Sequence, residues 1–126
     1  MKFREFKTSS GKLVLAGKNA ENNEELVKQI EENEYVFHSA KPGSPFVNIK
    51  SPKINEQDKK EAAVFCASKS QDWRDNKKDV EIHYFKGKDI YKRKGMSAGT
   101  FGVKKFNSIK IKKKEINEFL ENKKNE

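Results

Sequence analysis

The chain has 126 residues, enough for one domain, and its composition is polar, with 33% hydrophobic and 37% charged residues. No apolar run follows the first basic residues, no stretch approaches the roughly 20 apolar residues of a membrane span, and a single cysteine excludes an internal disulfide. We therefore expect a soluble, cytoplasmic protein, ordered by the packing of its nine Phe, three Tyr and one Trp.

A hairpin and a helix are predicted at the start of the chain. Residues 3–7 and 12–16 lie on either side of a Thr-Ser-Ser-Gly turn, which favours two paired strands. Asn19 can accept a hydrogen bond from the first turn of a helix, and the apolar residues that follow, around Leu26, share one helical stripe.

A turn rich in proline separates the next two predicted strands. Residues 35–38 and 46–49 are apolar and flank this turn, and His38 is the last residue of the first strand. After a Ser-Pro break, Asn55 is expected to cap a second helix. The alanine-rich centre of that helix, residues 62–67, should lie close against a sheet.

The lysine-rich part of the chain predicts further strands. Residues 80–86 begin this region as a strand, and residues 89–94 and 100–106 predict a hairpin around a glycine-rich loop. Residues 108–112 predict a strand with isoleucines on one face and lysines on the other.

The order of these elements predicts the fold class. We expect an α+β protein, a single compact domain in which a mainly antiparallel β-sheet is packed by two or three helices. The domain would cover residues 1–114, followed at 115–126 by a C-terminal helix with a frayed polar tail.

Positive charge is concentrated in one third of the chain. Residues 77–114 contain 13 Lys or Arg and three acidic residues, an excess of ten, while the whole chain carries +9. A segregated basic region is typical of proteins that bind a polyanion. The alternatives are a solvated lysine-rich face and an anionic membrane surface, and the second is disfavoured because the cations lie on strand-like sequence.

Motifs of enzymes and of metal sites are missing. His38, His83 and Cys66 lie on separate predicted elements, which does not suit a zinc site. The chain has neither the GxxxxGK[ST] nor the GxGxxG motif, and Cys66 lies inside an apolar run where an inert thiol is expected. Asp72 and Asp75 are expected to be solvated or capping. We predict no catalytic residue, no metal and no cofactor.

Aromatic residues are interleaved with the cations of the basic region. Cations bind phosphates and aromatic faces can stack unpaired bases, but a domain this polar also needs such rings for its core. We expect Phe85, Phe101 and Phe106 in the core, and leave Tyr91 and Trp73 open between packing and stacking.

Four stretches, taken in order, point to a known family. They are FKTSSGKLVLAGKNAENNEELVK, YVFHSAKPGSPFVNIK, EAAVFCASKSQDWRD and GKDIYKRKGMSAGTFGVKKF. Together they resemble NFACT-R, the RNA-binding domain of the NFACT proteins, from about residue 3 to residue 112. The resemblance implies a domain similar to the C-terminal RNA-binding domain of NEMF-type ribosome-quality-control factors.

The departures from this family limit what the resemblance implies. The chain lacks the helix-hairpin-helix region and the long coiled coil of the large members, so we expect a stand-alone version. Template-free peptide tailing belongs to the full-length proteins and is not transferred. Many relatives have histidine after the Gly-Ser of the turn, whereas this chain has Pro45.

His38 matches the histidine of the family and has several open roles. The ring could hydrogen-bond the turn or an RNA phosphate, it could pack as a structural residue, or it could act as a catalytic base. We favour the first of these.

The sequence thus predicts a non-catalytic module that binds tRNA or rRNA on ribosomes or large subunits with stalled chains. The alternatives are an accessory or adaptor subunit of a tRNA/RNA-modification enzyme and an enzyme that uses His38. The expected RNA-binding residues are Lys18, His38, Lys41, Ser44, Trp73, Arg74, Lys77, Lys78, Lys86, Lys88, Lys92, Arg93, Lys94, Lys104 and Lys105.

Overall fold

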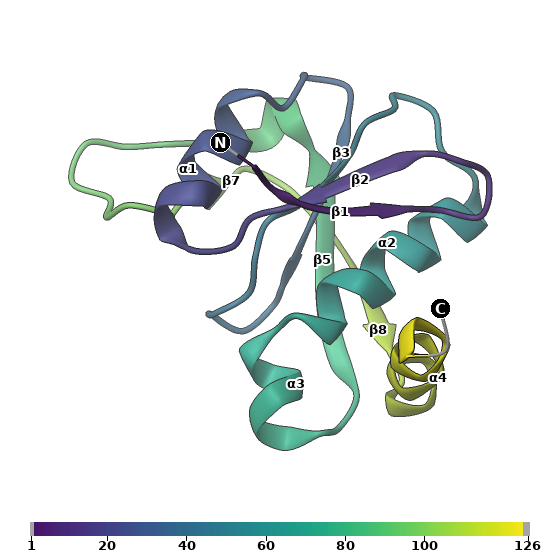
Figure 1. The fold of residues 1–126 in the computed structure, drawn as a ribbon. Helices are drawn as coiled ribbons and strands as arrows, with labels where there is room; N and C mark the ends of the chain where they lie inside the picture. The colour runs from purple at the N-terminus through teal and green to yellow at the C-terminus, as the bar shows by residue number, and fades with distance from the viewer. Residues whose placement is uncertain (1, 125–126) are drawn as a thin grey trace.

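The computed structural model describes residues 2–124 and arranges them as a sheet with helices on both faces (Figure 1). The strands are β1 (Arg4–Lys7), β2 (Leu13–Ala16), β3 (Tyr35–Ser39), β4 (Val47–Ile49), β5 (Val80–Lys86), β6 (Ile90–Tyr91), β7 (Gly102–Val103) and β8 (Asn107–Ile111). The helices are α1 (Ala20–Lys28), α2 (Glu56–Ser68), α3 (Gln71–Asn76) and α4 (Lys113–Lys124), and a 3-10 turn, Gly87–Asp89, follows β5. The predicted α+β class is confirmed, with four helices in the described part of the chain.

Six strands form one antiparallel sheet in the order β1-β2-β4-β3-β5-β8. At its centre β3 pairs with β5, and the register places His38 opposite His83. Opposite residues of an antiparallel pair project to the same face of a sheet. The two imidazoles therefore lie side by side on one face.

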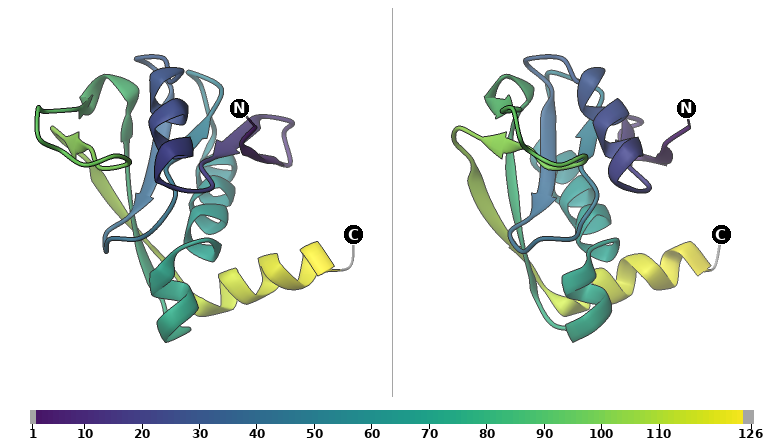
Figure 2. Two further views of the ribbon diagram at one scale, coloured as in Figure 1. Left: turned by 60° about the vertical axis from the view of Figure 1, so that its left-hand side comes forward. Right: turned by 90° about the vertical axis from the view of Figure 1, so that its left-hand side faces the viewer.

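The face that meets α2 and α4 carries the larger core. Phe37, Ile82 and Ile111 project onto it and are fully buried. The small side chains at 62–67 let α2 approach the sheet closely, as the alanine-rich sequence predicts. Ile116 anchors α4 in the same core, while the C-terminal part of α4 points away from the sheet (Figure 2).

The opposite face is covered by α1 and by the ribbon of β6 and β7 (Figure 2). Val36 and Phe85 from the sheet meet Leu26 of α1 in a second, smaller core. Phe101, beside β7, packs against the edge of this core. Phe85 and Phe101 thus pack as the sequence predicts.

Side-chain caps set the starts of the first three helices. Asn19 accepts from the N–H of Asn22, and Asn55 forms a reciprocal capping box with Asp58. A separate α3 is not predicted by the sequence. Ser70 creates it, because its hydroxyl donates to a carbonyl at the end of α2 and accepts from the first turn of α3.

The predicted hairpin of residues 89–94 and 100–106 is present but short. Each arm has only two paired residues, and the ribbon stays outside the main sheet. The ring of Tyr91 packs over Gly102, where a Cβ would lie 2.0 Å from the ring. Glycine is therefore needed at the point where the two arms meet.

At the end of the chain β8 has the predicted alternation, with Ile109 and Ile111 toward the core. The helix that follows begins at Lys113 and packs on α2, and the division after residue 114 stays a prediction. The predicted frayed end includes residues 125–126, which lie outside the described residues. No helix in the described part of the chain is long and apolar enough to cross a membrane.

Candidate nucleic-acid interface

The turn between β3 and β4 is fixed by hydrogen bonds within it and from α3. The N–H of Ser39 donates to Ser44 Oγ (2.9 Å), and the carbonyl of Gly43 accepts from the N–H of Gln71 (2.8 Å). Gly43 has a left-handed φ of +89°, and a Cβ there would lie 2.4 Å from the Gln71 side chain. Both facts require glycine in this turn.

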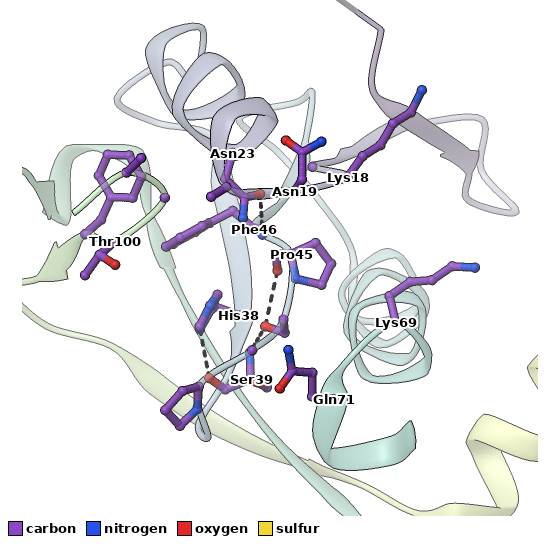
Figure 3. A pocket seen from close by; sticks show the side chains of 18 of the residues that line it. Lys18, Asn19, Asn23, His38, Ser39, Pro45, Phe46, Lys69, Gln71 and Thr100 are labelled. Carbon is purple, nitrogen blue, oxygen red and sulfur yellow. Dashed lines mark hydrogen bonds between the residues drawn. The ribbon is translucent and has the colours of Figure 1, made fainter. Parts of the chain in front are cut away.

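Asn23 of α1 joins the turn to the connection between β2 and α1. Its Oδ1 accepts from the N–H of Phe46 (3.2 Å; Figure 3). The same atom would lie 1.9 Å from a Cβ at Gly17, so a larger residue would displace the amide. Lys18 follows, with its N–H donating to Asn22 Oδ1 (2.9 Å) and its side chain exposed.

Lys92 fastens the glycine-rich loop onto α1. Its ammonium donates to Glu24 Oε2 (2.9 Å) and to the carbonyls of Ser97 (2.7 Å) and Thr100 (2.8 Å). The N–H of Gly99 reaches the same carboxylate oxygen (2.8 Å). The hydrogen bonds from Lys92 and Gly99 hold the pKa of Glu24 below its usual range. An ammonium has three N–H donors, so Lys92 ties the loop in place with no donor left for a phosphate.

A cleft of about 670 Å³ opens between the β3–β4 turn, the β2–α1 connection and the glycine-rich loop (Figure 3). The charged residues that line it within the described part of the chain are Arg4, Lys18, Lys69 and Arg74, and all four are cations. Lys18 and Lys69 extend on the same side of Pro45. A concave surface lined by one sign of charge concentrates ions of the opposite sign. The cleft therefore favours an anion.

The contacts of Arg74 and Arg4 leave both side chains exposed to an anion. Arg74 pairs with Asp75 (2.9 Å), which raises the pKa of the guanidinium, but both side chains are largely exposed and water screens the pair. Arg4 Nη1 donates to the carbonyl of Gly17 (3.3 Å), a neutral acceptor. Both side chains remain available to an anionic ligand.

The floor of the cleft is aromatic. The ring of His38 lies 4.5 Å from that of Phe46, and Phe101 meets Phe46 edge-on at 5.4 Å. His38 Nδ1 lies 2.8 Å from the carbonyl of Ser39, and because a carbonyl only accepts, Nδ1 carries the proton. Burial, reinforced by His83, lowers the pKa of His38. The ring is therefore neutral at pH 7, and its Nε2 can accept but cannot donate.

The structure brings four of the predicted RNA-binding residues together at this cleft. They are Lys18, His38, Ser44 and Arg74. Lys41 belongs to the same turn, but it does not line the cleft, and its ammonium lies 3.5 Å from Asp72.

Trp73 requires a correction. The side chain is 4% exposed and belongs to the main core, so in this structure the ring offers no face to an RNA base. The ammonium of Lys77 lies 5.0 Å over this ring, and the backbone of Lys77 is left-handed, with a φ of +50°. Lys77 and the exposed Lys78 follow α3 and do not line the cleft.

The other predicted cations lie near the β6–β7 ribbon. Lys86, Lys88 and Lys105 line a second hollow of about 540 Å³ together with two tyrosines, but Glu56 and Asp89 line it too. Exposed Arg93, Lys94 and Lys104 lie on the ribbon and its loop, where Arg93 sits 4.9 Å over the Tyr91 ring.

Several residues of the interface are not predicted by the sequence. Arg4 and Lys69 reach the cleft from distant elements, and no local pattern marks them. His83 also lines it, which follows only once β3 and β5 are known to pair with His38 opposite. Phe106, expected in the core, is 50% exposed and stacks on His83 at 4.0 Å. That expectation was wrong, because the residue lies in the connection just before β8.

The residues that the structure describes favour neither metal binding nor thiol chemistry. They contain no group of three or more His, Cys, Asp or Glu side chains that could hold a metal ion. Cys66 is buried, and burial raises the pKa of its thiol. A buried, protonated thiol is a poor nucleophile.

The chain is similar in sequence to known proteins. A family model described as "NFACT protein RNA binding domain" matches residues 2–105. The chain is 33% identical over 86 residues to a protein of Methanocaldococcus jannaschii named "Archaeal Rqc2 homolog aRqcH", a match that covers 66% of this chain and 13% of that protein.

A solved structure shows the same fold. It is the C-terminal part of the fibronectin/fibrinogen-binding protein from Streptococcus suis, similar with a TM-score of 0.81 and 21% sequence identity. The match covers 94% of this chain and 49% of that one. The chain therefore spans about half of the solved relative and a small part of the archaeal protein.

Proposed function

The chain belongs to the NFACT protein RNA-binding domain family, and from this premise we propose that it is a non-catalytic module that binds RNA through the cation-lined cleft. The observation that carries the proposal is the charge of the lining, since every charged residue of the described chain that faces the cleft is a cation. Phosphate groups are the anions that RNA presents along its whole length.

The surrounding hydrogen bonds suit such a role. Ser44 and Asn23 hold the turn, and Lys92 and Glu24 hold the loop, before any ligand arrives. A surface already in place loses less entropy when it binds. The affinity would come mainly from counterions released as Lys18, Lys69 and Arg74 neutralise phosphates.

We extend the proposal to the cellular partner. We propose that the chain binds tRNA or rRNA on large ribosomal subunits with stalled chains, in the cytoplasm. The name of the relative from Methanocaldococcus jannaschii, an Rqc2 homolog, supports the coarser part of this proposal, an RNA-binding role in quality control. Crosslinking in cells followed by sequencing of the bound RNA should recover tRNA or rRNA. Recovery of an RNA-modification enzyme with neither RNA would instead favour the role of an adaptor subunit.

Salt dependence tests the cleft directly. Removal of two phosphate contacts by the double substitution Lys18→Ala, Lys69→Ala should weaken RNA binding and reduce the slope of log K against log salt by about two. The measurement is fluorescence anisotropy with labelled tRNA between about 50 and 200 mM salt.

The double substitution Lys7→Ala, Lys53→Ala is the matched control, because it also removes two charges and both lysines are exposed and lie outside the cleft lining. It should leave both affinity and slope close to those of the wild type. A wild-type protein whose affinity does not change with salt would contradict binding through phosphates, and equal slopes for the double variant and the control would place the interface elsewhere.

A further inference from the structure

A row of aromatic rings crosses the sheet: four of them line the cleft, and the fifth, Phe106, lines the second hollow. Phe101 meets Phe46 at 5.4 Å, and Phe46 meets His38 at 4.5 Å. The β3–β5 register continues the row from His38 to His83, and Phe106 stacks on His83 at 4.0 Å with an angle of 21° between the ring planes. The row thus runs from the β6–β7 ribbon to the edge strand of the sheet.

The last ring of the row is open to solvent. Phe106 is 50% exposed and is the large hydrophobic side chain that stands out as exposed in the described part of the chain. His83 covers one face of the ring, so the solvent-exposed surface of Phe106 belongs to the other face and to the edges of the ring. A flat apolar face held parallel to a second ring offers a surface for a third planar group.

The support beneath Phe106 is itself fixed. His83 Nε2 lies 3.3 Å from Glu81 Oε2, and the hydroxyl of Ser108 donates to the same oxygen (3.0 Å). Glu81 therefore links β5 and β8 and sets the plane of the imidazole. Because β8 begins at Asn107, the backbone next to Phe106 is also held in the sheet.

The charge around this ring selects the kind of planar group. Lys104 and Lys105 directly precede Phe106. The second hollow beside the ring has an excess of cations, with two carboxylates, Glu56 and Asp89, against four lysines, which are Lys59, Lys86, Lys88 and Lys105. Aromatic faces flanked by cations bind single-stranded nucleic acid, since the cations follow the phosphates while the ring stacks a base. A base in a duplex hides both faces and cannot use such a ring.

We propose that Phe106, supported by His83, stacks one unpaired base of the bound RNA. This inference rests on the proposed RNA-binding function and narrows its substrate to RNA with a single-stranded loop or end. The phosphates next to the stacked base lie against Lys104 and Lys105, and the strand continues past His83 into the cation-lined cleft.

The test compares three replacements of Phe106 on the full chain. Phe106→Ala removes the ring, Phe106→Leu keeps an apolar side chain without a flat face, and Phe106→Trp keeps and enlarges the face. The probes are a labelled oligoadenylate, the same strand with abasic residues, and an RNA duplex. Stacking on one base should make Ala and Leu bind the oligoadenylate about fivefold or more weakly, whereas Trp should bind it as well as the wild type or better.

The duplex, the abasic strand and the salt slope separate this inference from the proposed function. We expect Phe106→Ala to bind the abasic strand and the RNA duplex with wild-type affinity and to show a wild-type salt slope, because the phosphate contacts remain. Wild-type affinity of Ala or Leu for the oligoadenylate would overturn the stack and leave the RNA-binding function standing. A wild-type protein that binds none of the probes would overturn both and leave Phe106 as a contact for a protein.

Discussion

His38 joins the core of the molecule to its binding surface. The ring packs on Phe46 and donates to the carbonyl of Ser39, so it fixes the point where β3 leaves the sheet and the turn begins. Its lowered pKa makes it a neutral group at pH 7. The residue thus acts on the shape of the cleft, and the exposed cations supply the charge.

We expect His38→Ala to lower the free energy of unfolding by about 1–2 kcal/mol, from the lost hydrogen bond and the lost packing. The pKa of His38 is lower in the folded than in the unfolded protein, where it is near 6.5. Below about pH 6.5 the unfolded state therefore binds more protons at this residue than the folded state does. The contribution of His38 to the free energy of unfolding is lost as the pH falls through that range. Urea unfolding at several pH values should show the difference between wild type and variant narrowing in acid. A constant difference would contradict this.

Binding measured on the same variant has a separate meaning. Because the neutral ring cannot donate to a phosphate, the RNA affinity of molecules that remain folded should stay close to that of the wild type. A loss of affinity without a loss of stability would instead show that His38 touches the ligand.

Lys92, Arg93 and Lys94 are predicted to bind RNA together, but in the structure the ammonium of Lys92 already donates to Glu24, Ser97 and Thr100. Lys92→Ala should lower the melting temperature, because Glu24, Ser97 and Thr100 lose a shared partner. The double substitution Arg93→Ala, Lys94→Ala should change stability by less than about 0.5 kcal/mol per residue and should weaken RNA binding.

Glu24→Gln provides the control for Lys92. It removes the charge of the carboxylate that holds both the ammonium and the N–H of Gly99, so it should reproduce the effect of Lys92→Ala. A double variant no less stable than either single variant would show that the two residues act as one unit. If the losses of stability of the two single variants simply added in the double variant, the two residues would not act through a shared interaction.

At the scale of the elements, one carboxylate joins the start of α2 to the first hairpin. Asp58 completes the capping box of α2 and accepts from the hydroxyl of Ser10 (2.6 Å) and the ammonium of Lys12 (3.3 Å). Burial by itself raises its pKa, but hydrogen bonds from Ser10, Asn55, Thr8 and Lys12 outweigh burial and lower the pKa to about 2. The hairpin therefore depends on the ionised form of a helix cap.

Replacing Asp58 with Asn should lower the free energy of unfolding by about 1–3 kcal/mol at neutral pH, the scale of a buried polar group without its partner. The folded pKa is lower than the unfolded value of about 3.9. The contribution of Asp58 is therefore present above about pH 4 and is lost as the pH falls toward about 2. Acid unfolding curves should show this loss in the wild type and a flatter curve in the variant. Glu5→Gln, at an exposed carboxylate of β1, is the control and should retain the wild-type curve.

The elements themselves could largely be predicted, because strand and helix patterns are local. Alternation predicts β8, and Asn19 and Asn55 mark the helix starts. The separate helix α3 was missed because Ser70 ends one helix and starts another within a single residue. Phe106 was misplaced because an aromatic residue beside a strand has the same local pattern whether it is buried or exposed.

At the scale of the whole molecule, the basic segment of the sequence does not form one basic surface. Lys77 and Lys78 precede β5 and lie beyond Ile111 of β8, whereas Lys104 and Lys105 precede the other end of β8. The paired strands between them separate the two groups by about 15–20 Å. The cleft was not predictable from charge density, because all four of its cations, Arg4, Lys18, Lys69 and Arg74, come from outside the basic segment of residues 77–114.

This separation allows a test with matched loss of charge. Two double variants each remove two positive charges: one is Lys104→Ala with Lys105→Ala, and the other is Lys77→Ala with Lys78→Ala. We expect the first pair to weaken RNA binding more, because it flanks the exposed ring of Phe106. Anisotropy at one salt concentration measures both, and melting temperatures check that the contact of Lys77 with Trp73 does not confuse the result. Equal losses would indicate that only the net charge matters.

The position of Cys66 makes its rate of thiol modification a measure of local opening of the structure. Its Sγ lies 3.9 Å from the carbonyl of Pro45, directly beneath the turn that borders the cleft. The thiolate of an exposed cysteine attacks an electrophilic thiol reagent, so modification of the buried Cys66 must wait until the turn lifts from α2. The rate of modification under native conditions therefore reports the opening of this wall of the cleft: it follows the population of the open state when reclosing is fast, and the opening rate when modification is faster than reclosing. RNA that fills the cleft should slow that rate, whereas RNA held only at the far end of the sheet should leave it unchanged.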